Sequence, residues 1–272
     1  ERDLYRLVEM VSGGRGRSLV ITGAGVSTES GIPDYRSPEG SYNKGHKPMM
    51  HQEFVRKEHN RKRYWARSLV GWRYFDQVEP SYPHHAFRKL EEQKLISGII
   101  TQNVDRLHLR AGSKSVVELH GYNDEVGCLS CGYSRPRREY QLELEELNHD
   151  WALQHLAPAA ASDVRADGDA HLVNEDFHDF QVPACPECGD GVLMPKVVFF
   201  GGSIPKETKD RAMQMVEEAS SLLVFGSSCQ VASVFRLCKA AADKSERTPI
   251  ALINIGPTRV DNIADLKIEA QC

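Results

Sequence analysis

Six short apolar runs, most of them rich in β-branched residues, constrain the fold of this chain more than any other feature. They cover residues 18–22, 98–101, 115–119, 196–200, 221–226 and 250–256. Helix-like stretches at 84–95, 206–220 and 234–244 lie between several of these runs. Such runs are typical of strands covered on both faces, and strands that alternate with helices form parallel sheets. The sequence therefore predicts an α/β fold with a mostly parallel sheet.

Two regions interrupt this alternation. Residues 44–82 are basic and aromatic, and we expect them to be helical without an intervening strand. Residues 127–194 contain two cysteine pairs and, between them, a long polar segment rich in Asp, Glu and Ala. A large domain with a smaller inserted module suits the length of 272 residues.

Charge and composition exclude several classes of protein. The formal net charge of -4 argues against broad nucleic-acid binding, because there is no basic excess to displace counterions. No apolar stretch approaches the ~20 residues that span a bilayer, so we expect a soluble protein without a membrane partner. The chain begins at Glu1 without a methionine, and we expect that any targeting segment has been removed.

Two Cys-x-x-Cys pairs, each followed by a glycine, give the strongest local signal. The four residues are Cys128, Cys131, Cys185 and Cys188. Four thiolates fill the tetrahedral coordination of Zn²⁺ and leave no position for water. The pairs therefore predict one structural zinc ion. The alternative is a redox-active pair, which fits two pairs in one module less well.

A Gly-Ala-Gly turn follows the first apolar run. Gly23 and Gly25 let the backbone approach a ligand, and a following helix would direct its N-terminus toward a pyrophosphate. The third glycine of the G-x-G-x-x-G fingerprint is absent, since Thr28 holds that position. A plain tight turn is an equal alternative for this motif taken alone.

Polar residues follow several of the apolar runs. Asn103 and Asp105 come directly after one run, and His120 follows the next. Residues 225–228 and 254–256 repeat the pattern with small, hydrogen-bonding residues. Open α/β sheets bind ligands at the carboxyl ends of their strands, so these positions together predict a cofactor site at one sheet edge. An amide beside a carboxylate is a fitting pair for binding a carboxamide.

These motifs, in this order, resemble the sirtuins, a family of NAD-dependent protein deacylases. The matching stretches are GAGVS, GIPDYR, TQNVDRLH, LHG, the four cysteines, PKVVFFG, GSS and NIG, and they cover the chain from about residue 15 to Cys272. The stretches RYWAR, FQVPAC and LINIGPTR are most similar to the mitochondrial class II type known as sirtuin four. The resemblance implies a mitochondrial matrix protein whose partners are acylated protein lysines.

The resemblance also implies a division into domains. Residues 1–43, 83–126 and 195–272 would form a Rossmann-like NAD-binding domain. Residues 44–82 would form the helical part of a small domain, and residues 127–194 its zinc-binding module with a long inserted loop. In this family the acyl-lysine oxygen attacks the nicotinamide ribose of NAD, nicotinamide leaves, and the acyl group ends on ADP-ribose.

Roles for individual residues follow from the same resemblance. Asn103 and His120 would be catalytic, with His120 as the general base that deprotonates a ribose hydroxyl. Asp34, Tyr35 and Arg36 would belong to a mobile loop that closes over NAD. The residues Val197, Val198 and Phe199 would pair with the substrate peptide as an added strand. Gly23, Ala24, Gly25 and Ser27 would line the phosphates, and Gln102, Asn103 and Asp105 would surround the nicotinamide and its ribose. Residues 226–228 and 254–256 would hold the adenosine half, with Cys272 near the adenine. The full set expected to bind NAD is Gly23, Ala24, Gly25, Ser27, Pro33, Asp34, Tyr35, Arg36, Gln102, Asn103, Val104, Asp105, Gly226, Ser227, Ser228, Asn254, Ile255, Gly256 and Cys272.

Tyr64 and Arg67 allow a prediction of which acyl groups the protein prefers. They are three residues apart and would share one face of a helix, where a phenol and a guanidinium could hold the carboxylate of an acyl chain. Desuccinylating relatives carry such a pair, so we expect a preference for longer, acid-tipped or lipoyl groups over acetyl. The alternative is an ordinary surface helix in a basic run.

The chain also departs from the family pattern. Gly202 stands where an acidic residue is frequent, Cys229 and Ser233 replace the usual leucine and proline, and the insert between the cysteine pairs is long. Two other functions stay open from the sequence: ADP-ribosyl transfer to a protein at the same site, and a non-catalytic NAD-binding scaffold.

Overall fold

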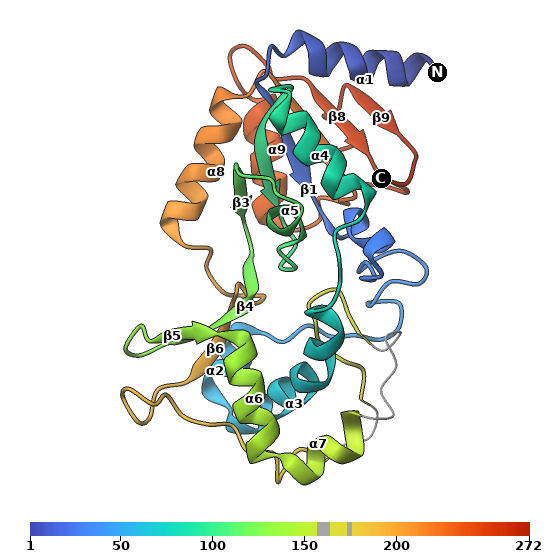
Figure 1. Ribbon diagram of the computed structural model, residues 1–272. Helices are drawn as coiled ribbons and strands as arrows, with labels where there is room; N and C mark the ends of the chain where they lie inside the picture. The colour runs from blue at the N-terminus through green and yellow to red at the C-terminus, as the bar shows by residue number, and fades with distance from the viewer. Residues whose placement is uncertain (157–163, 173–175) are drawn as a thin grey trace. The chain divides into compact units, whose positions relative to one another are not determined.

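The computed structural model describes residues 1–156, 164–172 and 176–272, which divide into two compact units (Figure 1). Unit 1 consists of Glu1–Gly31, Glu79–Leu119 and Ile204–Cys272. Unit 2 consists of Ile32–Val78 and His120–Ser203. None of the described helices has the length and apolar character needed to cross a membrane.

Unit 1 is built on a six-stranded sheet in the order β3-β2-β1-β7-β8-β9, and every neighbouring pair is parallel. Its strands are β1 (Ser18–Thr22), β2 (Ile96–Thr101), β3 (Val116–Glu118), β7 (Ser221–Phe225), β8 (Ile250–Ile253) and β9 (Leu266–Ile268). From β1 the chain first adds strands on one side and later, from β7, on the other. The order therefore reverses between β1 and β7, where open α/β sheets bind ligands. The predicted α/β fold with a mostly parallel sheet is confirmed.

Helices cover both faces of this sheet. Its helices are α1 (Arg2–Gly13), α4 (Tyr82–Glu92), α5 (Leu107–Arg110), α8 (Lys206–Glu218) and α9 (Ala232–Ala242). Leu19 and Ile21 of β1 pack in one cluster with residues of α8 and α9, whereas Val20 packs in another with α4 and α1. Successive strand residues point to opposite faces, so every residue of β1 is buried. This explains the continuous apolar runs in the sequence.

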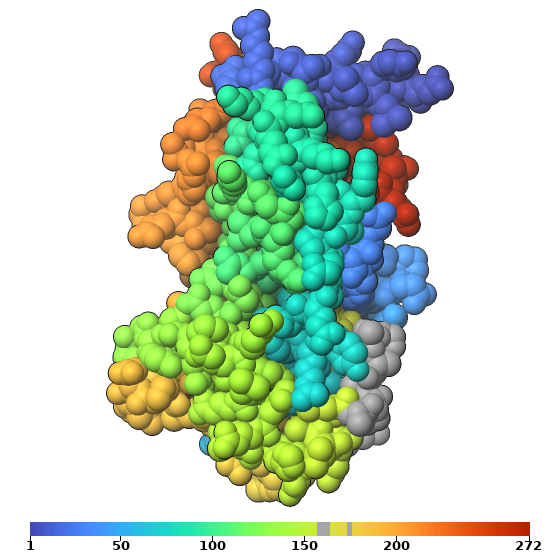
Figure 2. Space-filling model, in the orientation of Figure 1, coloured from blue at the N-terminus to red at the C-terminus, as the bar shows by residue number. Residues whose placement is uncertain are grey.

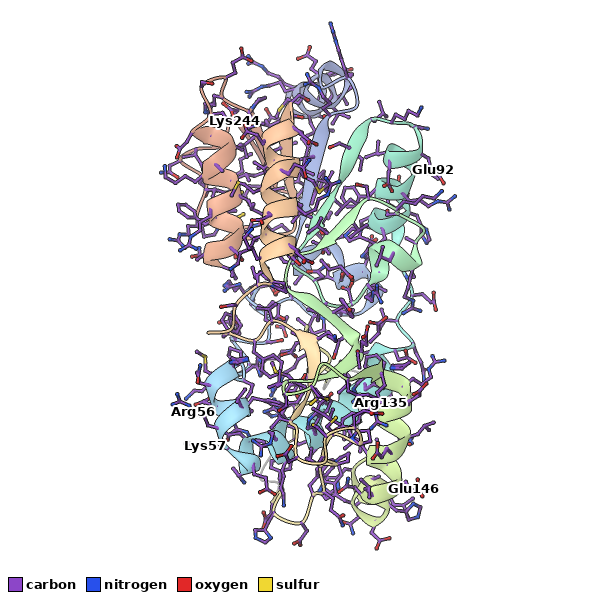
Figure 3. The ribbon with its side chains drawn as sticks, turned by 90° about the vertical axis from the view of Figure 1, so that its left-hand side faces the viewer. Arg56, Lys57, Glu92, Arg135, Glu146 and Lys244 are labelled. Carbon is purple, nitrogen blue, oxygen red and sulfur yellow. The ribbon has the colours of Figure 1, made fainter. Side chains whose placement is uncertain are left out.

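Side chains of unit 1 form hydrogen bonds with backbone carbonyls of other elements. Lys244 donates from its Nζ to the carbonyls of Val216 (2.6 Å) and Glu217 (2.7 Å) at the C-terminal end of α8 (Figure 3). The carbonyls of the last turn lack the usual partners four residues on, and that of Val216 accepts, among the described residues, only the N–H of Ala219 (3.3 Å) from the backbone. A cation at this end of the helix also interacts favourably with the helix dipole. Arg6 of α1 donates to the carbonyl of Asp265, next to β9, and Figure 2 shows the N-terminal helix against the C-terminal segment.

The helix expected after the Gly-Ala-Gly turn does not form. Two single turns of 3₁₀ helix take its place, η1 (Ala24–Val26) and η2 (Thr28–Ser30), and Gly31 ends them in a left-handed conformation. Ser and Thr hydroxyls compete for backbone hydrogen bonds and favour turns over helix; here the Thr28 hydroxyl donates to the carbonyl of Gly25 (3.0 Å). The turn is therefore not followed directly by a long helix whose N-terminus could bind an anion.

Unit 2 combines helices with a three-stranded antiparallel sheet in the order β5-β4-β6. Its elements are α2 (His51–Arg56), α3 (Glu58–Phe75), β4 (Gly121–Cys128), β5 (Ser134–Pro136), α6 (Arg137–Leu147), α7 (His149–Leu156) and β6 (Leu193–Val197). Its core centres on Trp65, which is fully buried and contacts Tyr140 with ring centroids 4.6 Å apart. Within residues 44–82, which were expected to be helical, α2 and α3 are helical, and residues 44–50 and 76–81 are not.

One predicted strand belongs to a different sheet. The run at 196–200 was expected in the large parallel sheet, but β6 pairs antiparallel with β4 in unit 2. The expectation was wrong because β4 was not anticipated: its sequence, GYNDEVGC, lacks an apolar run and buries mainly its last residues. A strand with one exposed side does not produce the continuous apolar signal of a central strand.

Candidate active site and metal centre

The loops after β1 and β7 lie in direct backbone contact at the point where the strand order reverses. Gly25 donates its N–H to the carbonyl of Gly226 (3.0 Å), and Gly23 donates to that of Phe225 (3.0 Å). A Cβ on Gly25 would lie 2.8 Å from the Cα of Gly226, and Gly226 itself has a φ of +59°. Glycine is therefore required at both Gly25 and Gly226 for the two loops to approach this closely, in addition to any role with a ligand.

Three of the predicted cofactor residues share a hydrogen-bonded cluster beside these loops. The Ser27 hydroxyl donates to Asp105 Oδ2 (2.7 Å), and the Asn103 amide donates to Ser27 Oγ (3.1 Å) and to the carbonyl of Gly23 (3.1 Å). The Leu107 N–H donates to the other carboxylate oxygen of Asp105 (2.9 Å). Burial raises the pKa of Asp105, and these donors oppose that shift. The cluster fixes the orientation of the Asn103 amide.

Gln102 connects this cluster to the loop after β7. Its amide donates to Ser227 Oγ (2.7 Å) and to the carbonyl of Thr22 (3.1 Å). Ser227 Oγ also accepts the N–H of Cys229 (3.2 Å). Residues predicted to surround the nicotinamide and residues predicted to hold the adenosine are thus joined at one sheet edge. Val104, which lies between them in the chain, is buried.

The remaining predicted adenosine residues follow β8 and end the chain. Asn254 donates from its side chain to the carbonyl of Ile255 (2.8 Å), and Gly256 donates its N–H to Glu269 (2.8 Å). The Ile255 side chain is 63% exposed. Burial raises the pKa of Cys272 to about 11, so its thiol stays protonated at neutral pH.

Two buried histidines beneath the cluster were missed from the sequence. His84 accepts the Ser81 N–H at Nδ1 (3.2 Å), so its Nε2 carries the proton toward Ser27 Oγ (3.5 Å). His108 Nε2 lies 2.9 Å from Thr22 Oγ1. Burial lowers the pKa of His84 to about 4 and that of His108 to about 3. Both are neutral supports of the site, and a histidine inside TQNVDRLH was the signal available in the sequence.

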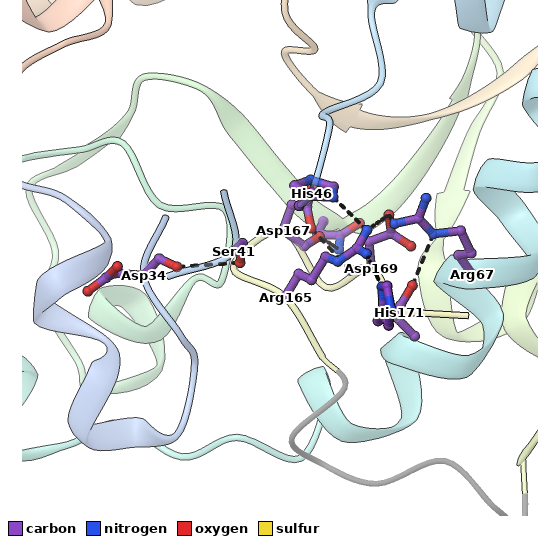
Figure 4. A network of polar contacts seen from close by, with 10 residues as sticks. Asp34, Ser41, His46, Arg67, Arg165, Asp167, Asp169 and His171 are labelled. Atoms are coloured by element: carbon purple, nitrogen blue, oxygen red, sulfur yellow. Dashed lines mark hydrogen bonds and ion pairs between the residues drawn. The ribbon is translucent and has the colours of Figure 1, made fainter. Parts of the chain in front are cut away.

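The loop predicted to close over the cofactor belongs to unit 2 and makes several contacts within itself. Asp34 accepts the N–H groups of Arg36 (2.9 Å) and Ser37 (2.8 Å), which is an Asx turn, and its carbonyl accepts the N–H of Ser41 (3.0 Å; Figure 4). The Arg36 guanidinium lies over the Tyr42 ring, 5.1 Å from its centroid. Pro33 and Tyr35 are half-buried beside these residues.

His120 begins the second segment of unit 2, directly before β4. Its carbonyl accepts the N–H of Val198 (2.8 Å), which extends the pairing of β4 with β6. Val197 and Val198 are half-buried, whereas the Phe199 side chain is buried in the core of the unit. Of the three residues predicted to pair with a peptide, Phe199 therefore offers only its backbone.

Tyr64 and Arg67 both lie on α3, but their surroundings differ. Tyr64 packs against Phe199 with ring centroids 5.0 Å apart, and burial raises the pKa of its phenol. Arg67 forms an ion pair of 2.7 Å with Asp169 and donates from Nε to the carbonyl of Ala170 (3.0 Å; Figure 4). The guanidinium thus has an acidic partner from the long insert, which the sequence did not indicate.

The four predicted zinc ligands converge in unit 2. Their sulfur atoms all lie within 4.8 Å of one another, with Cys128 and Cys188 3.7 Å apart and Cys131 and Cys185 3.6 Å apart. A tetrahedron with Zn–S bonds of about 2.3 Å has edges of about 3.8 Å, so the spacing fits one zinc ion. The Ser130 N–H donates to the sulfur of Cys128 (3.3 Å), a contact that stabilises the thiolate that zinc requires. With four protein ligands the ion is structural.

Comparison with known proteins places the chain in a family. The model of the Sir2 family matches residues 23–233. The chain is 47% identical to the NAD-dependent protein deacylase SRT2 of Arabidopsis thaliana over 98% of the chain and 72% of that protein. It is 44% identical to the NAD-dependent protein deacylase Sirt4 of Drosophila melanogaster over the whole chain and 85% of that protein.

Solved structures agree with the sequence comparison. A Sir2 protein in complex with a p53 peptide and NAD⁺ has a TM-score of 0.70 and 27% identity, covering 98% of this chain and 93% of that one. Sir2Tm bound to a propionylated peptide has a TM-score of 0.74 and 28% identity, covering 98% and 93%. The chain therefore belongs to the Sir2 family, the sirtuins.

Proposed function

We propose that this protein is an NAD-dependent protein lysine deacylase. The acyl group of a modified lysine passes to the ADP-ribose part of NAD, nicotinamide leaves, and the free lysine amine and an O-acyl-ADP-ribose are the products. The observation that carries the proposal is the cluster of Ser27, Asn103 and Asp105 at the ends of β1 and β2, in a chain whose relatives are described as NAD-dependent deacylases.

The cluster suits the handling of a nicotinamide ribose. Asn103 is held by two acceptors, Ser27 Oγ and the Gly23 carbonyl, so its side chain has a single orientation. Burial raises the pKa of Asp105, and the hydrogen bonds from Leu107 and Ser27 oppose that shift by stabilising the carboxylate. We assign both residues to binding and orienting the nicotinamide end of NAD, and the amides of residues 23–25 to its phosphates.

His120 is assigned the role of general base. Its backbone is fixed by the Val198 N–H, so the strand pairing of unit 2 determines where the imidazole can reach. Imidazole is the side chain best suited to accept a hydroxyl proton near neutral pH. The zinc ion would contribute only the structure of unit 2, because its four ligands leave no open position.

An assay of products tests this proposal. The protein is incubated with NAD and peptides carrying acetyl, succinyl, glutaryl or lipoyl lysine, and nicotinamide, deacylated peptide and O-acyl-ADP-ribose are measured by mass spectrometry. We expect all three products from at least one peptide, and a loss of about 10²–10⁴-fold in His120→Ala. His85→Ala, at an exposed histidine, is the matched control and keeps activity. Turnover in His120→Ala equal to the wild type contradicts the proposal.

The same assay separates the alternatives. Protein ADP-ribosylation gives a mass increase on an acceptor protein and nicotinamide without deacylated peptide. Lipoamidase activity gives turnover of the lipoyl peptide. A scaffold binds NAD without releasing nicotinamide.

For acyl specificity, we propose that longer, acid-tipped or lipoyl groups are removed in preference to acetyl. Tyr64 and Arg67 would contact the acyl chain. The buried positive charge of Arg67 favours an acid tip, whereas its ion pair with Asp169 opposes one. A strong preference for acetyl that is unchanged in Arg67→Ala contradicts this assignment.

We further propose that the protein acts in the mitochondrial matrix on acylated protein lysines. The support is its similarity to the Drosophila Sirt4 protein. Imaging of the tagged full-length protein against a matrix marker tests the location, and a cytosolic signal contradicts it.

A further inference from the structure

A buried network of charges joins the long insert to the rest of unit 2 (Figure 4). We call it the insert network; its members are His46, Arg67, Arg165, Asp167, Asp169 and His171. Arg67 on α3 pairs with Asp169 Oδ2 at 2.7 Å, and Arg165 reaches the same oxygen at 3.5 Å. The side chains of Asp169 and Arg67 are only 9% and 16% exposed.

The network is internally balanced. A guanidinium can only donate hydrogen bonds, so the Nδ1 atoms of His46 (2.5 Å) and His171 (2.7 Å) accept from Arg165. The Nε2 of His46 lies 3.6 Å from Asp167. Two arginines and two aspartates then leave no net charge. Any further carboxylate that approaches Arg67 must compete with Asp169, which is held in place by the chain itself.

The backbone of the insert is anchored independently of these charges. Asn123 of β4 donates to the carbonyl of Asp167 (2.9 Å), and Gly71 of α3 lies so close that a Cβ there would be 2.3 Å from the carbonyl of Gly168. Arg67 Nε also donates to the carbonyl of Ala170. Removing the Asp169 charge therefore leaves several contacts that keep residues 167–170 on α3.

We propose that Asp169 tunes the charge selectivity of the acyl site by occupying Arg67, so that an acid tip gains less over a neutral chain of equal length while the ion pair is intact than when it is broken. The inference rests on the proposed function, in which Arg67 contacts the acyl group. Asp169 acts through Arg67 and is a positioning residue, not a catalytic one. Its loss frees a buried guanidinium, which a carboxylate tip then satisfies.

Protonation of Asp169 would also free the Arg67 guanidinium, without a mutation. Burial raises its pKa to about 6, against the opposing charge of Arg67. The charged and titratable groups that face it are Arg67 and Tyr64 from α3, His46 from the preceding loop, and Arg165 and Asp167 from the insert. A succinyl tip, with a carboxyl pKa near ~4, stays ionised when Asp169 begins to protonate.

Matched peptides test the proposal. Succinyl-lysine and butyryl-lysine peptides have chains of equal length and differ in the terminal carboxylate. Their kcat/KM values and their dissociation constants by calorimetry are compared at pH 7.5. We expect Asp169→Asn to raise the succinyl-to-butyryl ratio about tenfold or more, Asp169→Glu to restore it toward the wild type, and Arg67→Ala to cancel the gain in the double variant. Asp179→Asn, a fully exposed aspartate of the same insert, is the control without effect.

A ratio unchanged in Asp169→Asn, or a gain that persists in the double variant, overturns the inference. Should Asp169→Asn fail to fold, the wild type decides: its succinyl-to-butyryl ratio rises between pH 7.5 and 5.5, and a constant ratio overturns the inference. Failure of the proposed function is distinguishable, because it abolishes turnover of both peptides, whereas the calorimetric ratio still reports on Asp169.

Discussion

His108 makes the stability of unit 1 sensitive to acid. Its side chain is 1% exposed, and burial lowers its pKa to about 3 in the folded protein. In the unfolded chain the pKa returns to about 6.5, so only the unfolded state takes up the proton between these values. The free energy of unfolding is therefore undiminished by His108 above pH 6.5 and decreases as the pH falls below that value. We predict that replacing His108 with Gln removes this loss.

The size of the effect follows from the two pKa values. For one group, the difference between pH 7 and pH 5 is about 2 kcal/mol, and the slope below pH 6 approaches about 1.4 kcal/mol per pH unit. This difference depends little on the pKa of His108 in the folded protein, because any pKa below ~4 leaves the imidazole neutral at pH 5. Glutamine keeps a donor for Thr22 Oγ1, which His108 contacts at 2.9 Å, and cannot be protonated.

Urea unfolding at pH 7 and pH 5, at constant ionic strength, measures the effect. Far-UV circular dichroism is the appropriate signal, because the three tryptophans, Trp65, Trp72 and Trp151, all belong to unit 2. The free energy of unfolding of the wild type should fall by about 2 kcal/mol more than that of His108→Gln between the two pH values. An equal fall in both proteins refutes the argument from buried neutral histidine.

Three further perturbations test other parts of the structure. Cys128→Ser removes one zinc ligand, so metal analysis should fall from about one zinc per chain to almost none, with tryptophan fluorescence reporting unfolding of unit 2; full zinc content contradicts the metal centre. Gly25→Ala places a Cβ 2.8 Å from the Cα of Gly226, so we expect a large rise in the KM for NAD with an unchanged far-UV spectrum, whereas an unchanged KM contradicts the need for this close approach. Trp65→Ala empties the core of unit 2 and should cost about 3–5 kcal/mol by urea unfolding followed at the remaining tryptophans, and a cost below about 1 kcal/mol contradicts the packing.

The central strands of unit 1 could be predicted from the sequence because their burial is complete. Residues 18–22 form β1 as expected, and the runs at 221–226 and 250–256 contain β7 and β8. Two other strands were harder to predict: β9 (Leu266–Ile268), at the edge of its sheet, is three residues long and half-buried, and β4, the middle strand of the sheet in unit 2, is largely polar. Apolar runs reveal strands that are covered on both faces, whereas short or largely polar strands carry no such signal.

The site could be predicted where a residue's role depends on its neighbours in the chain, and not where it depends on distant ones. The cysteine spacing was sufficient to predict four converging sulfurs, because each Cys-x-x-Cys turn places two ligands. Arg67 and Asp169 lie about 100 positions apart in the chain, so no local sequence pattern indicates that they pair. Likewise, Ser27 was expected to bind phosphate, but its hydroxyl is engaged by Asp105 and Asn103.

The stoichiometry of one reaction tests the central claim most directly. The protein is incubated with NAD and an acylated peptide, and nicotinamide, free lysine peptide and O-acyl-ADP-ribose are quantified together by mass spectrometry. If Asn103, Asp105 and His120 act as proposed, the three products form in equal amounts and none forms without the acyl group. Nicotinamide release that is independent of the acyl peptide, or deacylation without consumption of NAD, would contradict the account.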